Sequence, residues 1–462
     1  MNKKILALLL TPFLLLNGCD NSSNDDIATN PTTTDESGIT NTNTNTSTNT
    51  STNTSTSGLT TSGGQTTLDK YTIMIYMCGS DLESGGSEGI KAGGMGTANI
   101  KEILSINLPS NVNVVIETGG AKKWTTTYGI SASKTQRYEV KNKKLNLVES
   151  LSKANMGQTA TLQSFVQWGL ENYPAEKTGF IFWNHGGAMQ GICSDENYSY
   201  DSLTNSEVQL AFSNVFENLN RTEKLEWVGY DACLMQVQDV AEFNSTYFNY
   251  MVASQESEPG EGWDYDVWLK KLANNVDIDT KSLLSSVADS FISKCAASYN
   301  SYGGEYVGYN DGTMSVLDLS KIGEYKNSFE RVAKYLYSDV TTKSKFKTLL
   351  NKCNQFGYVY EDDYNGYYAF DVFDVGDFIS AVNTTYSDID TTSLKEKLND
   401  LVIYNVYGKN NYPSGTRKTL SGLSMFAAVN GVSTKSDYSL SQTNFEEWRL
   451  LNNNVGTWHL GY

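Results

Sequence analysis

The sequence predicts an α/β protein built as a three-layer α/β/α sandwich, with a mostly parallel central sheet and a C-terminal extension. Three observations lead to this fold class. Short runs rich in β-branched and aromatic residues recur between residues 70 and 255. Segments with helical spacing of apolar residues lie between them, and glycine or polar loops follow several of the runs. Strands that alternate with helices in this way favour a parallel sheet with helices on both faces.

The expected elements follow one another along the chain. The helix expected at 159–174 has Thr159 as a candidate cap, and Pro174 stops it. The alternation of apolar and polar residues at 137–150 predicts an antiparallel hairpin around a polar turn. A second helix is expected at 207–219, and strands are expected at 70–78, 111–118, 178–187, 225–234 and 249–255.

The pattern is weaker after residue 280. A helix is expected at 283–299, and the segments 313–322, 367–378 and 422–429 have the composition of strands or strand–loop units. They could extend the sheet or form a second lobe. We expect the folded domain to span residues 70–430, with residues 431–462 packing on it or extending it.

The N-terminus has the pattern of a secretory signal. Lys3 and Lys4 precede the apolar run 5–16, which is too short to cross a bilayer as a helix. The following residues, which end at Cys19, resemble the bacterial lipobox, in which the cysteine is lipidated. We therefore expect residues 1–19 to be a lipoprotein signal peptide and the protein to be anchored in the bacterial cell envelope. Ordinary secretion is the alternative.

Residues 20–69 contain almost no apolar side chains and cannot bury a core, so they predict a disordered tether. A flexible chain of about 50 residues has a root-mean-square span of roughly 40 Å. The whole chain carries a net charge of −17. This charge argues against a nucleic-acid partner, because phosphate binding needs a basic surface, and it mildly favours cationic substrates.

Cysteine and histidine usage points to a reactive thiol. Besides Cys19 the chain has five cysteines, an odd number with no C-x-x-C pair, which in an exported protein raises the question of a free thiol. Histidine occurs only at His185 and His459.

Chemistry-bearing residues gather where predicted parallel strands end. Ligands bind at the carboxyl ends of such strands, so these loops should share one sheet edge. His185 and Cys233 are 48 residues apart, which suits one helical crossover between neighbouring strands. The strand-end loops are Gly79-Ser80-Asp81, Asn184 to Gly187, Asp231-Ala232-Cys233 and Ser254-Gln255-Glu256.

A thiol beside an imidazole can act as a nucleophile, because the imidazole takes the thiol proton. Gly186 and Gly187 allow close backbone approach to a substrate, and N–H groups there and at Cys233 could bind an oxyanion. The alternatives are a core cysteine and a loop histidine. A zinc site would need ligands beyond His185 and Cys193 at sensible spacing, and no G-x-S-x-G turn supports a serine triad.

Four stretches resemble the successive motifs of clostripain-type cysteine peptidases, family C11 of the caspase-like CD clan: YTIMIYMCGSDLE, FIFWNHGGAMQGI, WVGYDACLMQ and MVASQESEPGEGW. The resemblance is strong over residues 70–270 and extends more weakly to about 430. It implies a caspase-like sandwich fold.

The resemblance also implies residue roles. It makes His185 the general base and then acid, and Cys233 the nucleophile, with Gly186 as an oxyanion donor. It places Asp231 at the base of the S1 pocket, where a carboxylate selects Arg or Lys at P1. From the residues alone, Asp231 could instead cap a helix at the strand-to-helix turn.

The acidic loop 254–266 would line the substrate cleft in a caspase-like enzyme. Glu256, Glu258 and Glu261 are candidates for a second contact with a basic side chain, and Glu261 is the expected one. A solvated acidic loop is the alternative. Some family members depend on calcium, but no EF-hand spacing is present, so neither calcium nor another cofactor is predicted.

The chain departs from the family in one respect. Several members cut themselves after a basic residue that follows the catalytic histidine, whereas residues 186–220 contain no Lys or Arg. Self-processing is then absent, uses Arg221 or Lys224, or is done by another enzyme.

The expected function is a lipid-anchored, exported cysteine endopeptidase that cleaves peptide bonds after Arg or Lys through a thioester. Its partners would be protein or peptide substrates and, through Cys19, a membrane. The alternatives are a catalytically silent, surface-tethered binding protein on a caspase-like scaffold and a secreted glycosidase, for which no carboxylate spacing singles out a pair.

Overall fold

The computed structural model describes residues 65–85, 93–301, 312–357, 370–408, 419–430 and 444–458, together with short strands at 59–62, 359–362, 366–368, 411–412 and 415–416. The strands of the central sheet are β1 (Leu59–Ser62), β2 (Gln65–Cys78), β3 (Val112–Gly119), β4 (Lys134–Lys141), β5 (Lys144–Ser152), β6 (Ala175–Trp183), β9 (Leu225–Asp231), β10 (Phe248–Ala253), β11 (Thr313–Asp318) and β16 (Val402–Tyr407). They are ordered β16–β11–β10–β9–β6–β2–β3–β4–β5, and β1 pairs with β2.

The middle of this sheet is parallel. Strands β10, β9, β6, β2 and β3 run in one direction, so their carboxyl ends lie at one edge. Antiparallel strands flank them, with β11 and β16 on one side and β4 and β5 on the other. The expected fold class is therefore confirmed, and so is the hairpin expected at 137–150.

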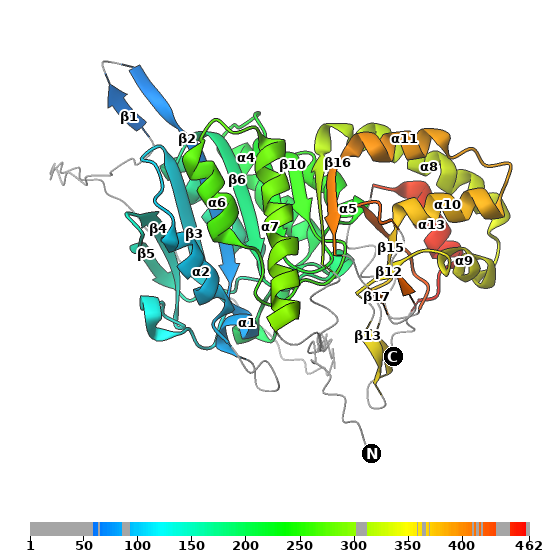
Figure 1. The fold of residues 1–462 in the computed structure, drawn as a ribbon, viewed down its shortest axis with the longest axis horizontal. Coiled ribbons are helices and arrows are strands. Elements are labelled where there is room, and N and C mark those ends of the chain that lie inside the picture. Colours follow the sequence, from blue (N-terminus) through cyan, green and yellow to red (C-terminus); the bar gives the residue numbers. More distant parts are fainter. Residues whose placement is uncertain are drawn as a thin grey trace, which may run out of the picture. The chain divides into compact units, whose positions relative to one another are not determined.

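Helices cover both faces of the sheet (Figure 1). The helices α2 (Met95–Ser105), α6 (Tyr265–Asn274) and α7 (Thr280–Ser301) share one apolar core with Ile73 and Ile75 of β2. The helices α3 (Thr159–Asn172), α4 (Asn205–Asn218) and α5 (Gln238–Asn244) share the other core with Met74 and Tyr76. Successive side chains in the second half of β2 thus enter opposite cores, which is why residues 73–78 are apolar without interruption.

The C-terminal region both extends the sheet and forms a second packed layer. Its separate sheet holds β12 (Gln355–Phe356), β15 (Val372–Asp374) and β19 (Ser424–Phe426). The side chain of Trp448 is fully buried, and its Nε1–H donates to the Phe426 carbonyl at 2.7 Å. The helices of this region are α8 (Ile322–Asp339), α9 (Lys343–Leu350), α10 (Val375–Thr385), α11 (Thr392–Leu401) and α13 (Glu446–Val455).

Three further pairs of short strands lie outside these two sheets. The pairs are β7 (Ile192–Asp195) with β8 (Asp201–Leu203), β13 (Val359–Asp362) with β14 (Gly366–Tyr368), and β17 (Asn411–Tyr412) with β18 (Gly415–Thr416). The helix α1 (Ser80–Ser84) directly follows β2.

Some expected boundaries are wrong. The first strand of the parallel core begins at Gln65 rather than at residue 70, and it pairs with β1 inside the segment expected to be a tether. The threonines there are β-branched and suit a strand despite their polarity. Thr159 is the first helical residue of α3 rather than its cap. The segment 367–378 contains β15 and then α10, whose start Asp374 caps by accepting from the Asp377 N–H.

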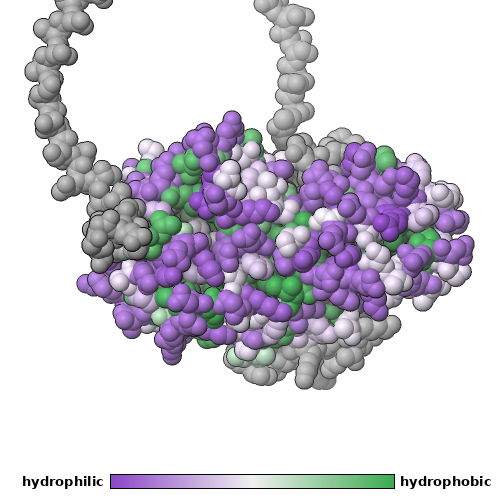
Figure 2. All heavy atoms as spheres, turned by 90° about the horizontal axis from the view of Figure 1, so that it is seen from above, coloured by the Kyte–Doolittle hydropathy of each residue, from purple (hydrophilic) through white to green (hydrophobic). Residues whose placement is uncertain are grey.

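The face seen in Figure 2 is mostly hydrophilic, with small scattered hydrophobic patches. Within the described part of the chain, no helix has the length and apolar character needed to span a bilayer. The expected signal peptide, residues 1–19, lies outside the described residues.

Candidate active site

The register between β6 and β9 brings His185 and Cys233 together. Trp183 pairs with Asp231 across these parallel strands, and the Asn184 N–H donates to the Asp231 carbonyl at 3.3 Å. His185 and Cys233 are both two residues beyond this pair, so they leave the sheet at the same level. The two loops touch, because a Cβ built on Gly186 would lie 2.3 Å from the Cys233 carbonyl oxygen.

Asn184 holds the histidine loop in place. Its Nδ2 donates to the Cys78 carbonyl at 2.6 Å, and its Oδ1 accepts the Ser194 N–H at 2.8 Å. The Cys193 N–H also donates to the His185 carbonyl at 3.2 Å. The loop is therefore fixed between the end of β2 and the β7–β8 hairpin. This hairpin and α4 lie within 186–220, the segment that lacks basic residues.

The imidazole of His185 contacts the carboxylate of Asp81, a residue to which the sequence alone assigns no role. The His185 Nε2 and the Asp81 Oδ1 are 2.7 Å apart, and the two side chains are 17% and 2% exposed. Burial alone would raise the pKa of Asp81, but the hydrogen bond and charge of His185 outweigh it and lower that pKa. The sequence placed Asp81 in a loop at the correct sheet edge, but nothing in its spacing indicated a partner.

The backbone turns sharply after Cys233. Leu234 is buried and has a φ of 66°, in the left-handed region that a leucine rarely adopts. Its N–H donates to the Glu256 carbonyl at 3.1 Å, which docks the turn on the loop that follows β10. Strain of this kind persists only where surrounding contacts impose it, and it is frequent at functional sites.

The Cys233 sulfur is held by the same acidic loop. The Glu258 N–H donates to Sγ at 3.2 Å, and the Glu258 carbonyl lies 3.7 Å from Sγ. Burial raises the pKa of the thiol to about 12; the Glu258 amide opposes this shift, whereas the charges of Glu258 and Glu256 add to it. In this conformation the thiol is therefore protonated at neutral pH and needs a base.

Asp231 is a buried carboxyl two residues before the thiol. Its Oδ1 accepts the Trp263 N–H at 3.1 Å, and its Oδ2 accepts the Tyr265 hydroxyl at 2.9 Å. Burial raises its pKa to about 6 against the lowering effect of these two hydrogen bonds and of the Lys294 charge. A helix cap does not describe this carboxyl, since its partners come from the loop before α6 and from the start of that helix.

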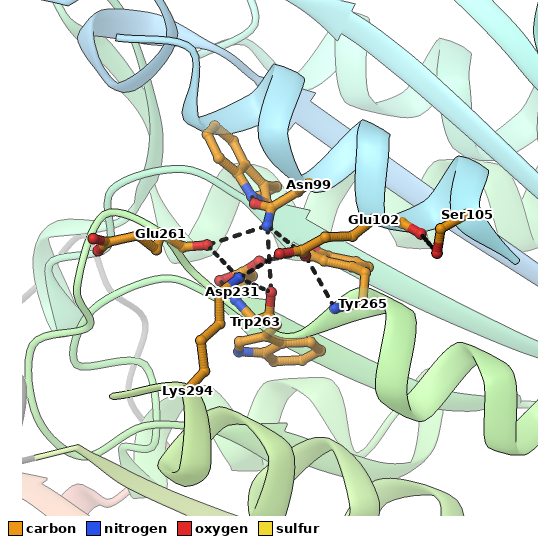
Figure 3. A network of polar contacts seen from close by, with 9 residues as sticks. Asn99, Glu102, Ser105, Asp231, Glu261, Trp263, Tyr265 and Lys294 are labelled. Atoms are coloured by element: carbon orange, nitrogen blue, oxygen red, sulfur yellow. Dashed lines mark hydrogen bonds and ion pairs between the residues drawn. The ribbon is translucent and has the colours of Figure 1, made fainter. Parts of the chain in front are cut away.

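Of the three candidate glutamates, Glu258 is the one whose carboxyl interacts electrostatically with that of Asp231. Burial and, after it, the charge of Asp231 raise the pKa of Glu258 well above its ordinary value. The two carboxyls thus form a buried acid pair that retains a proton. The carboxylate of Glu261, the residue expected from sequence, points away from Asp231 in Figure 3.

A partly buried polar network fixes the loop that carries these groups (Figure 3). Asn99 of α2 donates through Nδ2 to the carbonyls of Glu261, at 3.1 Å, and Trp263, at 3.3 Å. Lys294 of α7 donates to the same carbonyls at 3.1 and 2.9 Å and pairs with Glu102 at 2.8 Å. Asn99 and Lys294 were missed in the sequence because nothing local relates α2 and α7 to this loop.

The described residues form neither a metal-binding cluster nor a disulfide. Within the ranges that the structure describes, no group of three or more His, Cys, Asp or Glu side chains is placed to hold a metal ion. The five cysteines of this part of the chain, Cys78, Cys193, Cys233, Cys295 and Cys353, form no disulfide with one another.

A thiol and an imidazole on adjacent strand ends of a parallel sheet are the arrangement of α/β cysteine peptidases. The chain belongs to the clostripain family of these enzymes, whose family model matches residues 75–449. It is 24% identical over 439 residues to clostripain of Hathewaya histolytica, a match that covers 85% of this chain and 80% of clostripain.

Two solved structures share the fold. A secreted C11 cysteine protease of Bacteroides thetaiotaomicron, in complex with an irreversible peptide inhibitor, superposes with a TM-score of 0.59 at 16% identity and covers 82% of this chain and 99% of its own. An inactive zymogen C11 protease of Parabacteroides distasonis gives a TM-score of 0.56 at 18% identity, with coverage of 82% and 97%.

Because the His185 and Cys233 loops touch at Gly186, a methyl group added at this residue should disturb the site. Gly186→Ala would place Cβ 2.3 Å from the Cys233 carbonyl, so the backbone must move and activity should fall at least ~100-fold. Gly187→Ala is the matched control, because its Cβ would lie 3.2 Å from the Gln190 Cβ, a contact that a shift of a few tenths of an ångström relieves. Peptide hydrolysis by both variants checks this, and equal rates would contradict it.

Proposed function

We propose that this protein is an exported, lipid-anchored endopeptidase that cleaves after Arg or Lys, with Cys233 as nucleophile and His185 as general base. The observation that carries the proposal is the placement of both residues two positions beyond one register pair of β6 and β9. The membership in the clostripain family supports the same reaction class.

The proposed reaction begins with attack of the Cys233 sulfur on the scissile carbonyl. Because the pKa of the resting thiol is raised to about 12, His185 takes the proton as the sulfur attacks. His185 then gives this proton to the leaving amine, the C–N bond breaks and a thioester forms. A water molecule, deprotonated by His185, releases the acid product and restores the thiol.

The oxyanion that forms during both steps needs hydrogen-bond donors. We assign this role to the N–H groups of Gly186 and Cys233. The bridge between Gly186 and Ile192 supports the assignment, since its hydrogen bonds are donated by the neighbouring Gly187 and Cys193 N–H groups and do not use the Gly186 N–H. Removal of one such donor typically costs 10²–10³ in rate. The thiol, imidazole and amides suffice for the reaction, so we propose no cofactor.

The buried acid pair supports selection of a basic P1 side chain. Asp231 and Glu258 together retain one proton and so carry about one negative charge. A guanidinium or ammonium group that enters the S1 pocket would neutralise this charge in a desolvated setting. Glu261 remains the second candidate contact from the loop.

Lipid anchoring rests on sequence alone. The apolar run 5–16 and Cys19 support export followed by acylation of the cysteine, which would leave the peptidase domain on a membrane of the bacterial envelope.

The nucleophile is tested by hydrolysis of Arg-P1 and Lys-P1 amide reporters. Wild-type protein should cleave them in the presence of EDTA, whereas Cys233→Ala should fall to background. Cys353→Ala, which removes another partly buried thiol, should leave the rate within about 2-fold. Equal background rates for wild type and Cys233→Ala would instead favour a silent binding scaffold.

The role of Asp231 in selecting a basic P1 side chain is tested by a change of pH and by substitution. Because the pKa of Asp231 is about 6, its ionised fraction rises as the pH increases from 5 to 7. The Ki of a reversible Arg-P1 peptide should therefore decrease roughly 10-fold over that range, while the Ki of its Leu-P1 analogue stays flat. Asp231→Asn should remove this pH dependence and weaken the Arg-P1 peptide at least ~30-fold. A wild-type preference for acidic or apolar P1 would contradict the assignment.

The anchor is tested in cells of a bacterial expression host. Radiolabelled palmitate should be incorporated into the wild-type chain, which should sediment with membranes. Cys19→Ser should lose the label and appear in the soluble fraction, and a labelled Cys19→Ser chain would contradict the proposal.

A further inference from the structure

We propose that Asp81 is a positioning residue for the reaction: it fixes the tautomer of His185, so that the site works as a Cys233–His185–Asp81 triad. This inference rests on the proposed function, in which His185 is the general base. It adds a third residue, and it assigns each ring nitrogen a separate task.

The geometry of the contact determines the tautomer. The Asp81 Oδ1 lies 2.7 Å from the His185 Nε2, and an ionised carboxylate can only accept a hydrogen bond. The neutral imidazole must therefore carry its one proton on Nε2 and donate it to Asp81. Nδ1 is then left with the lone pair that can take the thiol proton.

Asp81 is held in its ionised form. Burial would raise the pKa of this carboxyl, but the hydrogen bond and charge of His185 lower it below its ordinary value. The Ser80 hydroxyl, 3.2 Å from Oδ1, donates a further hydrogen bond. When Nδ1 takes the proton from Cys233, the imidazolium is formed next to a fixed, 2%-exposed carboxylate, which stabilises that charge.

The fold preorganises this contact. Asp81 lies three residues beyond the end of β2, and β2 pairs in parallel with β6, which carries His185 at its carboxyl end. The Asn184 side chain ties the two loops together at the Cys78 carbonyl. Gly79 packs so closely that a Cβ there would lie 2.7 Å from the Trp124 ring. The start of α1 therefore has little freedom to move Asp81 away from the imidazole.

Substitution by asparagine separates tautomer control from simple packing. The carboxamide of Asp81→Asn has nearly the same shape, but its NH₂ can donate to Nε2 and so favour the proton on Nδ1, which disables the base. The kcat for an Arg-P1 reporter should fall roughly 10²- to 10⁴-fold with KM changed less than about 3-fold. Asp81→Ala should also lose activity.

Glu83→Gln is the matched control. Glu83 is a second buried carboxylate of α1, but it accepts hydrogen bonds from Thr97 and Thr125 instead of the histidine. This variant should retain most of the kcat. A loss in Glu83→Gln as large as that in Asp81→Asn would show that any disturbance of α1 is sufficient, and it would overturn the proposal.

A direct readout is available because the chain has only two histidines. In full-length protein labelled with ¹⁵N-histidine, with His459→Gln as background, ¹⁵N NMR at pH 8 should show a protonated Nε2 and an unprotonated Nδ1 for His185. Asp81→Asn should shift the proton towards Nδ1, and Glu83→Gln should not.

The NMR result is independent of peptide hydrolysis. If the wild-type chain cleaves no reporter but shows the Nε2-protonated ring and the shift in Asp81→Asn, the proposed function fails while the positioning role of Asp81 stands. A wild-type ring protonated on Nδ1, or an Asp81→Asn ring that keeps its proton on Nε2 with unchanged kcat, would overturn the inference.

Discussion

The site depends on the parallel register between β6 and β9. Because Trp183 is paired with Asp231, equal numbers of residues lead to the imidazole and the thiol, and both groups emerge at one sheet edge. A slip of one residue would exchange the faces of a whole strand, and both faces of this sheet are buried. The apolar cores therefore specify the register, and the register brings the loops of His185 and Cys233 to one sheet edge. Packing far from these loops thus determines their relative position.

The same edge holds two buried aspartates whose pKa values are shifted in opposite directions. Asp81 faces an imidazole that can become a cation, and its pKa is lowered. Asp231 is surrounded by a hydroxyl, an amide and the carboxyl of Glu258, and its pKa is raised to about 6. Environment alone separates their roles, as in other enzymes with paired carboxyls. In the proposed mechanism Asp81 serves the base, and Asp231 is suited to meet a cationic side chain.

Much of the fold and part of the site could be predicted from the sequence. Apolar runs between helical segments identified the parallel strands, and strand-end loops placed His185 and Cys233 at one edge. The role of Asp81 could not be predicted, because a carboxylate in a polar loop has many possible partners. Glu258 could not be separated from Glu261, since the direction of each side chain depends on the loop, which Asn99 and Lys294 fix from distant helices.

We propose that Cys233 is a nucleophile served by His185 and directed to basic side chains. Peptide mapping by mass spectrometry, after reaction with an irreversible chloromethyl ketone that carries Lys at P1, tests this most directly. We expect one adduct per chain, on Cys233, that is suppressed by His185→Ala and by a competing Arg-P1 peptide. An adduct on Cys193 or Cys353 instead, or equal labelling by a Glu-P1 reagent, would contradict it.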